Sequence, residues 1–186
     1  LNLKGVRGLD AVLNWNGQQF EIESSLCGVG NAYNIAAAVC VVLFEGINAK
    51  DIHSGVKKLA AYSQRGILTE ISGIHIYDDS YNSNPRALEL ALQLIADSKG
   101  YDRKVAIVGD MLELGENAVA YHEEAGRHAA KSGIEFLITA GSLTQHMADE
   151  SRKHGVPEVQ STSSSAEAAE LAVKTLRPGD LVLIKG

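Results

Sequence analysis

From about Gly66 to its end, the sequence alternates short aliphatic and β-branched runs with longer segments of helical periodicity. Strands that are joined through helices are usually parallel, and helices then cover both faces of their sheet. The alternation therefore predicts a doubly wound, Rossmann-like α/β domain with a parallel sheet. After a hairpin of ILTEI and IHIY, strands are expected at 104–108, 135–140, near Val159 and at 181–185, with helices at 84–97, 117–131, 142–153 and 165–176.

Two helix starts in this region carry polar capping signals. Asn84 followed by Pro85 predicts an N-cap and a first helical turn, because proline gives up only an amide that has no partner there. Ser164 followed by Glu167 fits a capping box, in which each side chain bonds a free backbone amide of the other residue.

The first 65 residues have a different pattern. Ala11–Trp15 and Gln19–Glu23 have strand composition, and Asn16-Gly17 between them predicts a tight hairpin turn. A helix is expected over 31–46, apolar on nearly all sides and hence buried on most of them. A second helix, capped by Asn48, is expected over 49–61. The pattern changes after Arg65, so we expect a domain boundary between residues 65 and 66.

Composition and charge exclude several functional classes. The net charge is −6 and the basic residues are scattered, which gives no footprint for a nucleic acid. No apolar run approaches the roughly 20 residues that span a membrane, and the start lacks a secretory signal. We therefore expect a cytoplasmic protein without nucleic-acid or membrane partners. Its two cysteines are predicted to be buried and reduced, and His122 and His128 to lie on a helix surface.

The segment YDDSYNSNP (77–85) concentrates polar and aromatic side chains between a strand and a helix start. In an open α/β sheet this position faces the ligand crevice. Capping and turn formation need only one or two of these residues. The rest predict a binding function, with the carboxylates accepting hydrogen bonds from ribose hydroxyls and Tyr81, Asn82 and Asn84 offering donors to a substrate.

Three ordered stretches resemble the Mur ligase family: DDSYNSNP (78–85), GDMLELGE (109–116) and YHEEAG (121–126). The first is similar to a signature of the members that add D-alanyl-D-alanine to UDP-N-acetylmuramoyl-tripeptide in peptidoglycan synthesis, with Ser83 in place of alanine. The resemblance implies an ATP-dependent amide ligase that acts through an acyl phosphate. It also implies that residues 1–65 end a central ATP-binding domain and that 66–186 form a slightly truncated C-terminal domain.

The resemblance further implies site residues. The segment GVGNAYNIAAA (28–38) is similar to a family segment in which two asparagines hold adenine, with Gly30 in place of a histidine; these asparagines would be Asn31 and Asn34. Arg65 falls where the family has an arginine that reaches the nucleotide, and Asp79 where it has the ribose carboxylate. Tyr81, Asn82 and Asn84 would bind the acceptor dipeptide.

Two acidic residues of the second stretch keep open roles. Asp110 and Glu113 follow strand 104–108, and either could face the incoming dipeptide. No catalytic residue and no metal ligand is expected in residues 1–186, because the phosphate-binding loop and the Mg²⁺ ligands of the family would lie upstream of Leu1. We therefore expect residues 1–186 to be a monomer that is inactive in ligation by itself.

Three alternatives stay open from the sequence. Another member of the Mur ligase superfamily, either the ligase that adds the third residue or a folylpolyglutamate synthetase, would share the chemistry but use another acceptor. A non-catalytic nucleotide-binding module would share only the fold. The asparagine-rich segment DDSYNSNP favours the D-alanyl-D-alanine acceptor.

Overall fold

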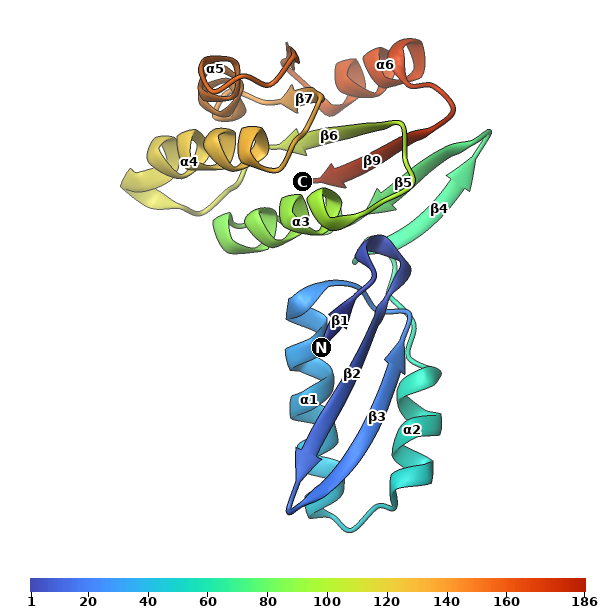
Figure 1. Cartoon of the computed structure of the whole chain (residues 1–186). Coiled ribbons are helices and arrows are strands. Elements are labelled where there is room, and N and C mark those ends of the chain that lie inside the picture. Colours follow the sequence, from blue (N-terminus) through green and yellow to red (C-terminus); the bar gives the residue numbers. More distant parts are fainter. The chain divides into compact units, whose positions relative to one another are not determined.

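The computed structural model describes residues 1–186, which form two compact units, Leu1–Tyr62 and Ser63–Gly186 (Figure 1). Each unit has its own sheet. None of the helices combines the length and the apolar character that crossing a membrane requires.

Unit 1 contains a three-stranded antiparallel sheet and two α-helices. Asn16 and Gly17 both have positive φ, 48° and 80°, as a tight hairpin turn requires, so the predicted hairpin is confirmed. The elements of the unit are β1 (Asn2–Leu3), the 3-10 turn η1 (Gly5–Arg7), β2 (Leu9–Trp15), β3 (Gln18–Ser24), α1 (Gly28–Phe44) and α2 (Ala49–Lys57).

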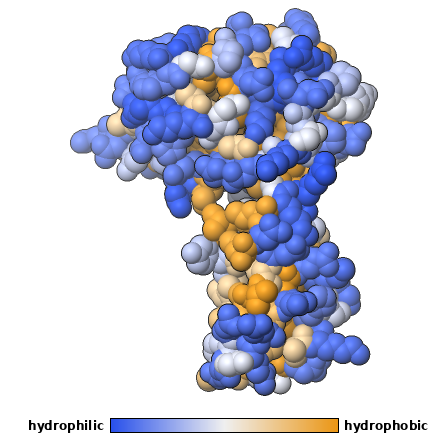
Figure 2. All heavy atoms as spheres, viewed as in Figure 1, coloured by the Kyte–Doolittle hydropathy of each residue, from blue (hydrophilic) through white to orange (hydrophobic).

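The core of unit 1 lies between its sheet and its helices. Ile35 and Val39 of α1 pack there with strand residues Leu9 and Ile22 and with α2. The prediction that α1 is buried on most sides is wrong, because the three-stranded sheet covers only one side of it: Phe44 is 80% exposed. Apolar patches are accordingly visible on unit 1 in Figure 2. Of the two cysteines, Cys27 is buried as predicted, whereas Cys40 on α1 is exposed.

Unit 2 is the predicted α/β domain. Its six-stranded sheet has the order β4-β5-β9-β6-β7-β8 and is parallel except for the edge strand β4, which pairs antiparallel with β5. The strands are β4 (Ile67–Ile71), β5 (Ile74–Asp78), β6 (Arg103–Gly109), β7 (Phe136–Ala140), β8 (Glu158–Thr162) and β9 (Asp180–Lys185). The doubly wound fold is thus confirmed, with one antiparallel edge.

Helices cover both faces of this sheet (Figure 1). On one face α6 packs against alternate strand residues such as Val105, Phe136 and Val182, all fully buried. The opposite face is covered by the other three helices. The helical elements of unit 2 are α3 (Pro85–Asp97), the 3-10 turn η2 (Gly115–Asn117), α4 (Ala118–Lys131), α5 (Thr144–Lys153) and α6 (Ser165–Thr175).

The helix starts follow the predicted caps with one correction. The side-chain oxygen of Asn84 accepts the N–H of Ala87 at 2.8 Å, and that of Ser164 accepts the N–H of Glu167 at 3.2 Å. The Glu167 carboxylate, however, bonds the backbone N–H and the hydroxyl of Ser163 rather than the N–H of Ser164. The capping box is therefore displaced by one residue.

Candidate functional site

The candidate site lies at the carboxyl edge of the unit 2 sheet. Strands β5, β9 and β6 are parallel neighbours, so the loops that follow β5 and β6 meet the end of β9 at this edge. The contact is close: the N–H of Asp79 bonds the backbone oxygen of Ile184 at 3.0 Å. A side chain at Gly109 would meet the Cα of Gly186 at 3.3 Å. The chain ends of three strands are thus brought together, as the predicted parallel topology requires.

Lys185 is the residue of this site that the sequence reasoning missed. Its side chain is 3% exposed, and its ammonium donates to the backbone oxygens of Asp79, at 3.1 Å, and of Asn82. The same nitrogen lies 3.1 Å from Oδ2 of the Asp79 carboxylate. The one available signal was a single cation at the end of the otherwise apolar strand LVLIK.

Arg65 and Tyr81 lie together at this edge. The guanidinium carbon of Arg65 lies 3.9 Å from the centre of the Tyr81 ring, within cation–π distance. The backbone fixes this pair, because the N–H of Tyr81 donates to the backbone oxygen of Gln64 at 3.0 Å. Tyr81 is nevertheless 59% exposed, so its ring and hydroxyl face solvent.

The two asparagines of the loop use their side-chain oxygens internally. Asn82 Oδ1 accepts the N–H of Ser83, while Asn84 Oδ1 caps α3. The amide nitrogens of both side chains make no hydrogen bond within the chain and both residues are exposed. Asp78, in contrast, accepts hydrogen bonds from both the N–H and the hydroxyl of Ser80 and has a turn-forming role.

Asp110 and Glu113 differ in their surroundings. The Asp110 carboxylate accepts the N–H of Thr144 at 2.7 Å and so joins the loop after β6 to the start of α5. Gly141 lies so close to this carboxylate that a side chain there would overlap it. Glu113 is exposed with a φ of 61°. Asp110 therefore has an internal partner, and Glu113 has a carboxylate open to solvent.

His122, on α4, contacts the loop that follows β6 at this edge of the sheet. The prediction that it lies on a helix surface is wrong, since its exposure is 0%. Its Nε2 accepts the N–H of Met111 at 3.0 Å, and its Nδ1 lies 2.7 Å from the backbone oxygen of Ala118. This imidazole fastens the loop after β6 to α4. His128, six residues later on α4, has a side chain that is 25% exposed.

Asn31 and Asn34 lie on the first turns of α1, in unit 1. The Asn31 amide donates to the backbone oxygen of Cys27 at 2.9 Å, four residues before it, and does not cap the helix, whose N-cap is Cys27. Asn34 is exposed, and its side chain makes no hydrogen bond within the chain. Gly30 is part of the helix.

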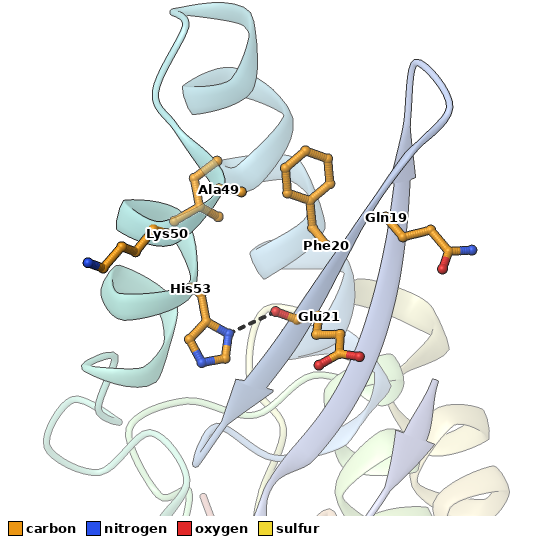
Figure 3. Close-up of a pocket in the computed structure, with 7 residues that line it drawn as sticks. Gln19, Phe20, Glu21, Ala49, Lys50 and His53 are labelled. Atoms are coloured by element: carbon orange, nitrogen blue, oxygen red, sulfur yellow. Dashed lines mark hydrogen bonds between the residues drawn. The ribbon is translucent and has the colours of Figure 1, made fainter.

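Unit 1 also has a surface hollow between β3 and the start of α2, shown in Figure 3. The backbone oxygen of Glu21 and the His53 ring meet there, 3.0 Å apart. None of the predicted site residues lines this hollow. It is lined by Gln19, Phe20, Glu21, Ala49, Lys50, Ile52 and His53.

Comparisons with known proteins bear on this site. The UDP-N-acetylmuramoyl-tripeptide--D-alanyl-D-alanine ligase of Bacillus subtilis (strain 168) is 31% identical to the chain over 162 residues, which are 86% of the chain and 35% of the relative. Two solved structures share the fold at 23% identity: MurF from Acinetobacter baumannii (TM-score 0.87; 100% of this chain and 40% of that one) and the MurF ligase from Thermotoga maritima in complex with ADP (0.79; 97% and 40%).

The chain thus spans little more than a third of the length of the relatives it matches. Residues 64–186, nearly all of unit 2, match the family described as "Mur ligase, glutamate ligase domain". The parallel sheet and the polar loops at its carboxyl edge are consistent with this family match. The chain therefore belongs to the Mur ligase family, through its glutamate ligase domain.

Proposed function

We propose that this chain forms the C-terminal part of an ATP-dependent ligase that adds D-alanyl-D-alanine to UDP-N-acetylmuramoyl-tripeptide. In this proposal, residues 1–65 end a central ATP-binding domain and residues 66–186 form the C-terminal domain. The loop DDSYNSNP at the carboxyl edge of the sheet carries the proposal, together with the B. subtilis ligase, whose own name states this reaction. We expect a cytoplasmic, monomeric enzyme.

The nucleotide side of the proposal rests on Asp79 and Arg65. One oxygen of the Asp79 carboxylate is paired with Lys185, while Oδ1 has no partner within the chain. That oxygen can accept hydrogen bonds from ribose hydroxyls. The exposed guanidinium of Arg65 can bind phosphate oxygens as a fork of donors. Asn31 and Asn34 would contact adenine, since a side-chain amide both donates and accepts.

The acceptor side rests on Tyr81, Asn82 and Asn84. Their remaining donors are the phenol hydroxyl and two amide nitrogens, beside the N-terminus of α3. A free dipeptide carries a terminal carboxylate, which such donors and a helix N-terminus both favour. We propose that these residues hold the carboxylate end of D-alanyl-D-alanine, so that its amine is oriented toward the activated tripeptide.

The reaction needs activation, because a carboxylate is a poor electrophile. ATP, taken with Mg²⁺, supplies the phosphoryl group that converts the tripeptide carboxylate to an acyl phosphate, and the amine of the dipeptide then displaces phosphate. The residues of this chain contribute orientation rather than covalent chemistry. Orientation of two reactants can account for a large part of a rate enhancement.

The substitution Asn84→Asp tests the acceptor role without removing the cap, because aspartate caps helices as well as asparagine does. It deletes the donor amide and places a negative charge beside the dipeptide carboxylate. We expect the KM for D-alanyl-D-alanine to rise roughly 10-fold or more in the complete ligase, in line with the loss of a hydrogen bond to a charged group. The KM for ATP should not change.

The control is Asn48→Asp at the cap of α2 in unit 1, where the new carboxylate faces Asp51 and not a residue proposed to bind the dipeptide. It should leave both KM values unchanged. An Asn84→Asp enzyme with a wild-type KM for the dipeptide would argue against the acceptor role.

The acceptor itself distinguishes the proposal from its alternatives. The complete ligase should release ADP and form a pentapeptide product, detected by mass spectrometry, with D-alanyl-D-alanine. A product formed with a single amino acid instead would identify a third-residue-adding ligase or a folylpolyglutamate synthetase. Nucleotide binding without any product would identify a non-catalytic module.

A further inference from the structure

The ammonium of Lys185 is enclosed at the carboxyl edge of the sheet. At 3% exposure it has almost no contact with water, although lysine is rarely this buried unless it is paired. It contacts two backbone oxygens and one carboxylate, all from the loop that follows β5. In sequence, Lys185 is 106 residues away from Asp79.

These contacts exclude one simple role for Lys185. An ammonium has three N–H groups. The two backbone oxygens and the Asp79 carboxylate together account for all three, so no donor is left for a phosphate or for a substrate carboxylate. Lys185 therefore acts through the loop and not by touching a ligand.

The loop depends on β9 at two successive residues. Ile184 accepts the N–H of Asp79, and Lys185 holds the carbonyl and carboxylate of the same residue. Lys185 thereby fixes Oδ2 of Asp79, and Oδ1 stays available to accept a hydrogen bond from a ligand. A second contact, to the carbonyl of Asn82, holds the far end of the turn. Without the cation, two adjacent carboxylates, Asp78 and Asp79, would repel each other and two carbonyls would lose their donor.

We infer that Lys185 is a positioning residue that orients the Asp79 carboxylate, and with it the turn to Asn82, for the ribose of the nucleotide. This inference rests on the proposed function, because it takes the ribose role of Asp79 from there. It goes further by assigning the selectivity for ribose hydroxyls to a buried cation on another strand.

The test compares ATP with 2′,3′-dideoxy-ATP in the complete ligase. Wild type should prefer ATP in kcat/KM. In Lys185→Met, which keeps the apolar stem and removes the cation, this preference should fall about tenfold or more, as expected when hydrogen bonds to a charged group are lost. Asp79→Asn should lower the preference for ATP by a similar factor. The double variant Lys185→Met with Asp79→Asn should lower this preference little further, because both substitutions remove the same interaction.

Lys104→Met is the matched control. Lys104 is the second residue of β6, near the opposite edge of the same sheet, and its partly buried ammonium also donates to a backbone oxygen, that of Ala96, at 2.5 Å. A purely structural effect of losing such a lysine would lower stability in both variants. The preference for ATP should stay at the wild-type level in Lys104→Met.

The outcomes separate the inference from the proposed function. A wild-type enzyme that does not ligate D-alanyl-D-alanine contradicts the proposed function. A wild-type enzyme that ligates, with a folded Lys185→Met variant that keeps the full preference for ATP, overturns the inference alone. If Lys185→Met does not fold, the preference for ATP is measured in Lys185→Arg instead. Arginine keeps the charge, but its planar guanidinium cannot place one nitrogen on all three acceptors. A reduced preference supports the inference, and a wild-type preference overturns it.

Discussion

The buried imidazole of His122 accepts a hydrogen bond from the backbone N–H of Met111, with 3.0 Å between the two nitrogens. Since Nε2 accepts, it carries no proton, and Nδ1 must donate to the backbone oxygen of Ala118. A single tautomer thus joins the loop after β6 to the first turn of α4. The stretch YHEEAG therefore has a structural use: it anchors a loop of the candidate site.

Replacing this imidazole should destabilise unit 2. His122→Phe fills the space but leaves the buried N–H of Met111 without an acceptor, which costs about 1–3 kcal/mol. Urea unfolding followed by circular dichroism measures the change. His128→Phe on the same helix, where the side chain is partly exposed and the ring nitrogens lie no closer than 3.8 Å to Glu89 and Glu124, should stay within about 0.5 kcal/mol of wild type. Equal stabilities of the two variants would contradict the assignment.

Gly126, one helical turn after His122, sets the distance between α4 and α5. A methyl group there would lie 2.4 Å from the backbone oxygen of Met147 and 3.1 Å from the N–H nitrogen of Ser151. Backbone atoms cannot rotate away as a side chain can, so Gly126→Ala must separate the helices. We expect it to lower the free energy of unfolding by about 1–3 kcal/mol.

Gly55→Ala is the opposite case and the control for Gly126→Ala. Gly55 lies inside α2 with open space around it, so alanine adds helix propensity without a clash. It should raise the stability of unit 1 by about 0.5–1 kcal/mol. The fluorescence of Trp15, the only tryptophan, reports on that unit. If both glycine substitutions change stability in the same direction, close backbone approach is not what decides the effect at Gly126.

Local chemistry explains what the sequence could predict. Asn16-Gly17 fixes a hairpin turn through positive φ, and Asn84 with Pro85 fixes a helix start, because both signals act within a few residues. The order of strands and helices in unit 2 followed from the same kind of local periodicity. The parallel topology then brought the loops after β5 and β6 to one edge, as expected.

The contacts that were not predicted join residues far apart in the sequence or depend on small side chains. Lys185 and Asp79 are 106 residues apart and come together only through the pairing of β5 with β9. His122 shares its helix face with Ala125, Gly126 and Ala129, and such small residues give little hydrophobic signal even though they are buried. Tyr33 and Phe44 made α1 look like a core helix, yet unit 1 has no surface that covers them.

The displaced capping box of α6 predicts that the stability of unit 2 depends on pH. The Glu167 carboxylate accepts the backbone N–H of Ser163 and then its hydroxyl, and these bonds lower the pKa of Glu167. A lowered pKa in the folded state means that the stabilisation is present above the ordinary glutamate pKa and is lost as the pH falls through the lowered value. Carbon-detected NMR titration should place the Glu167 midpoint below the ordinary glutamate range.

Ser163→Ala should raise that midpoint only in part. The substitution removes the hydroxyl but keeps the backbone N–H, which is the larger cause of the shift. A Glu167 midpoint that returns fully to the ordinary range in this variant would show that the hydroxyl, and not the backbone, is the main donor.

The Arg65–Tyr81 pair provides the last prediction. Because the guanidinium lies 3.9 Å from the ring centre at an exposed position, the contact should contribute about 0.5–1 kcal/mol. Tyr81→Leu should lose this amount and Tyr81→Phe should keep it, since phenylalanine retains the ring face. A double-mutant cycle of Tyr81→Leu with Arg65→Met isolates the interaction, measured by urea unfolding of unit 2. A coupling energy near zero would mean that the loop backbone, through the Tyr81 N–H and the Gln64 carbonyl, holds Tyr81 without help from the cation.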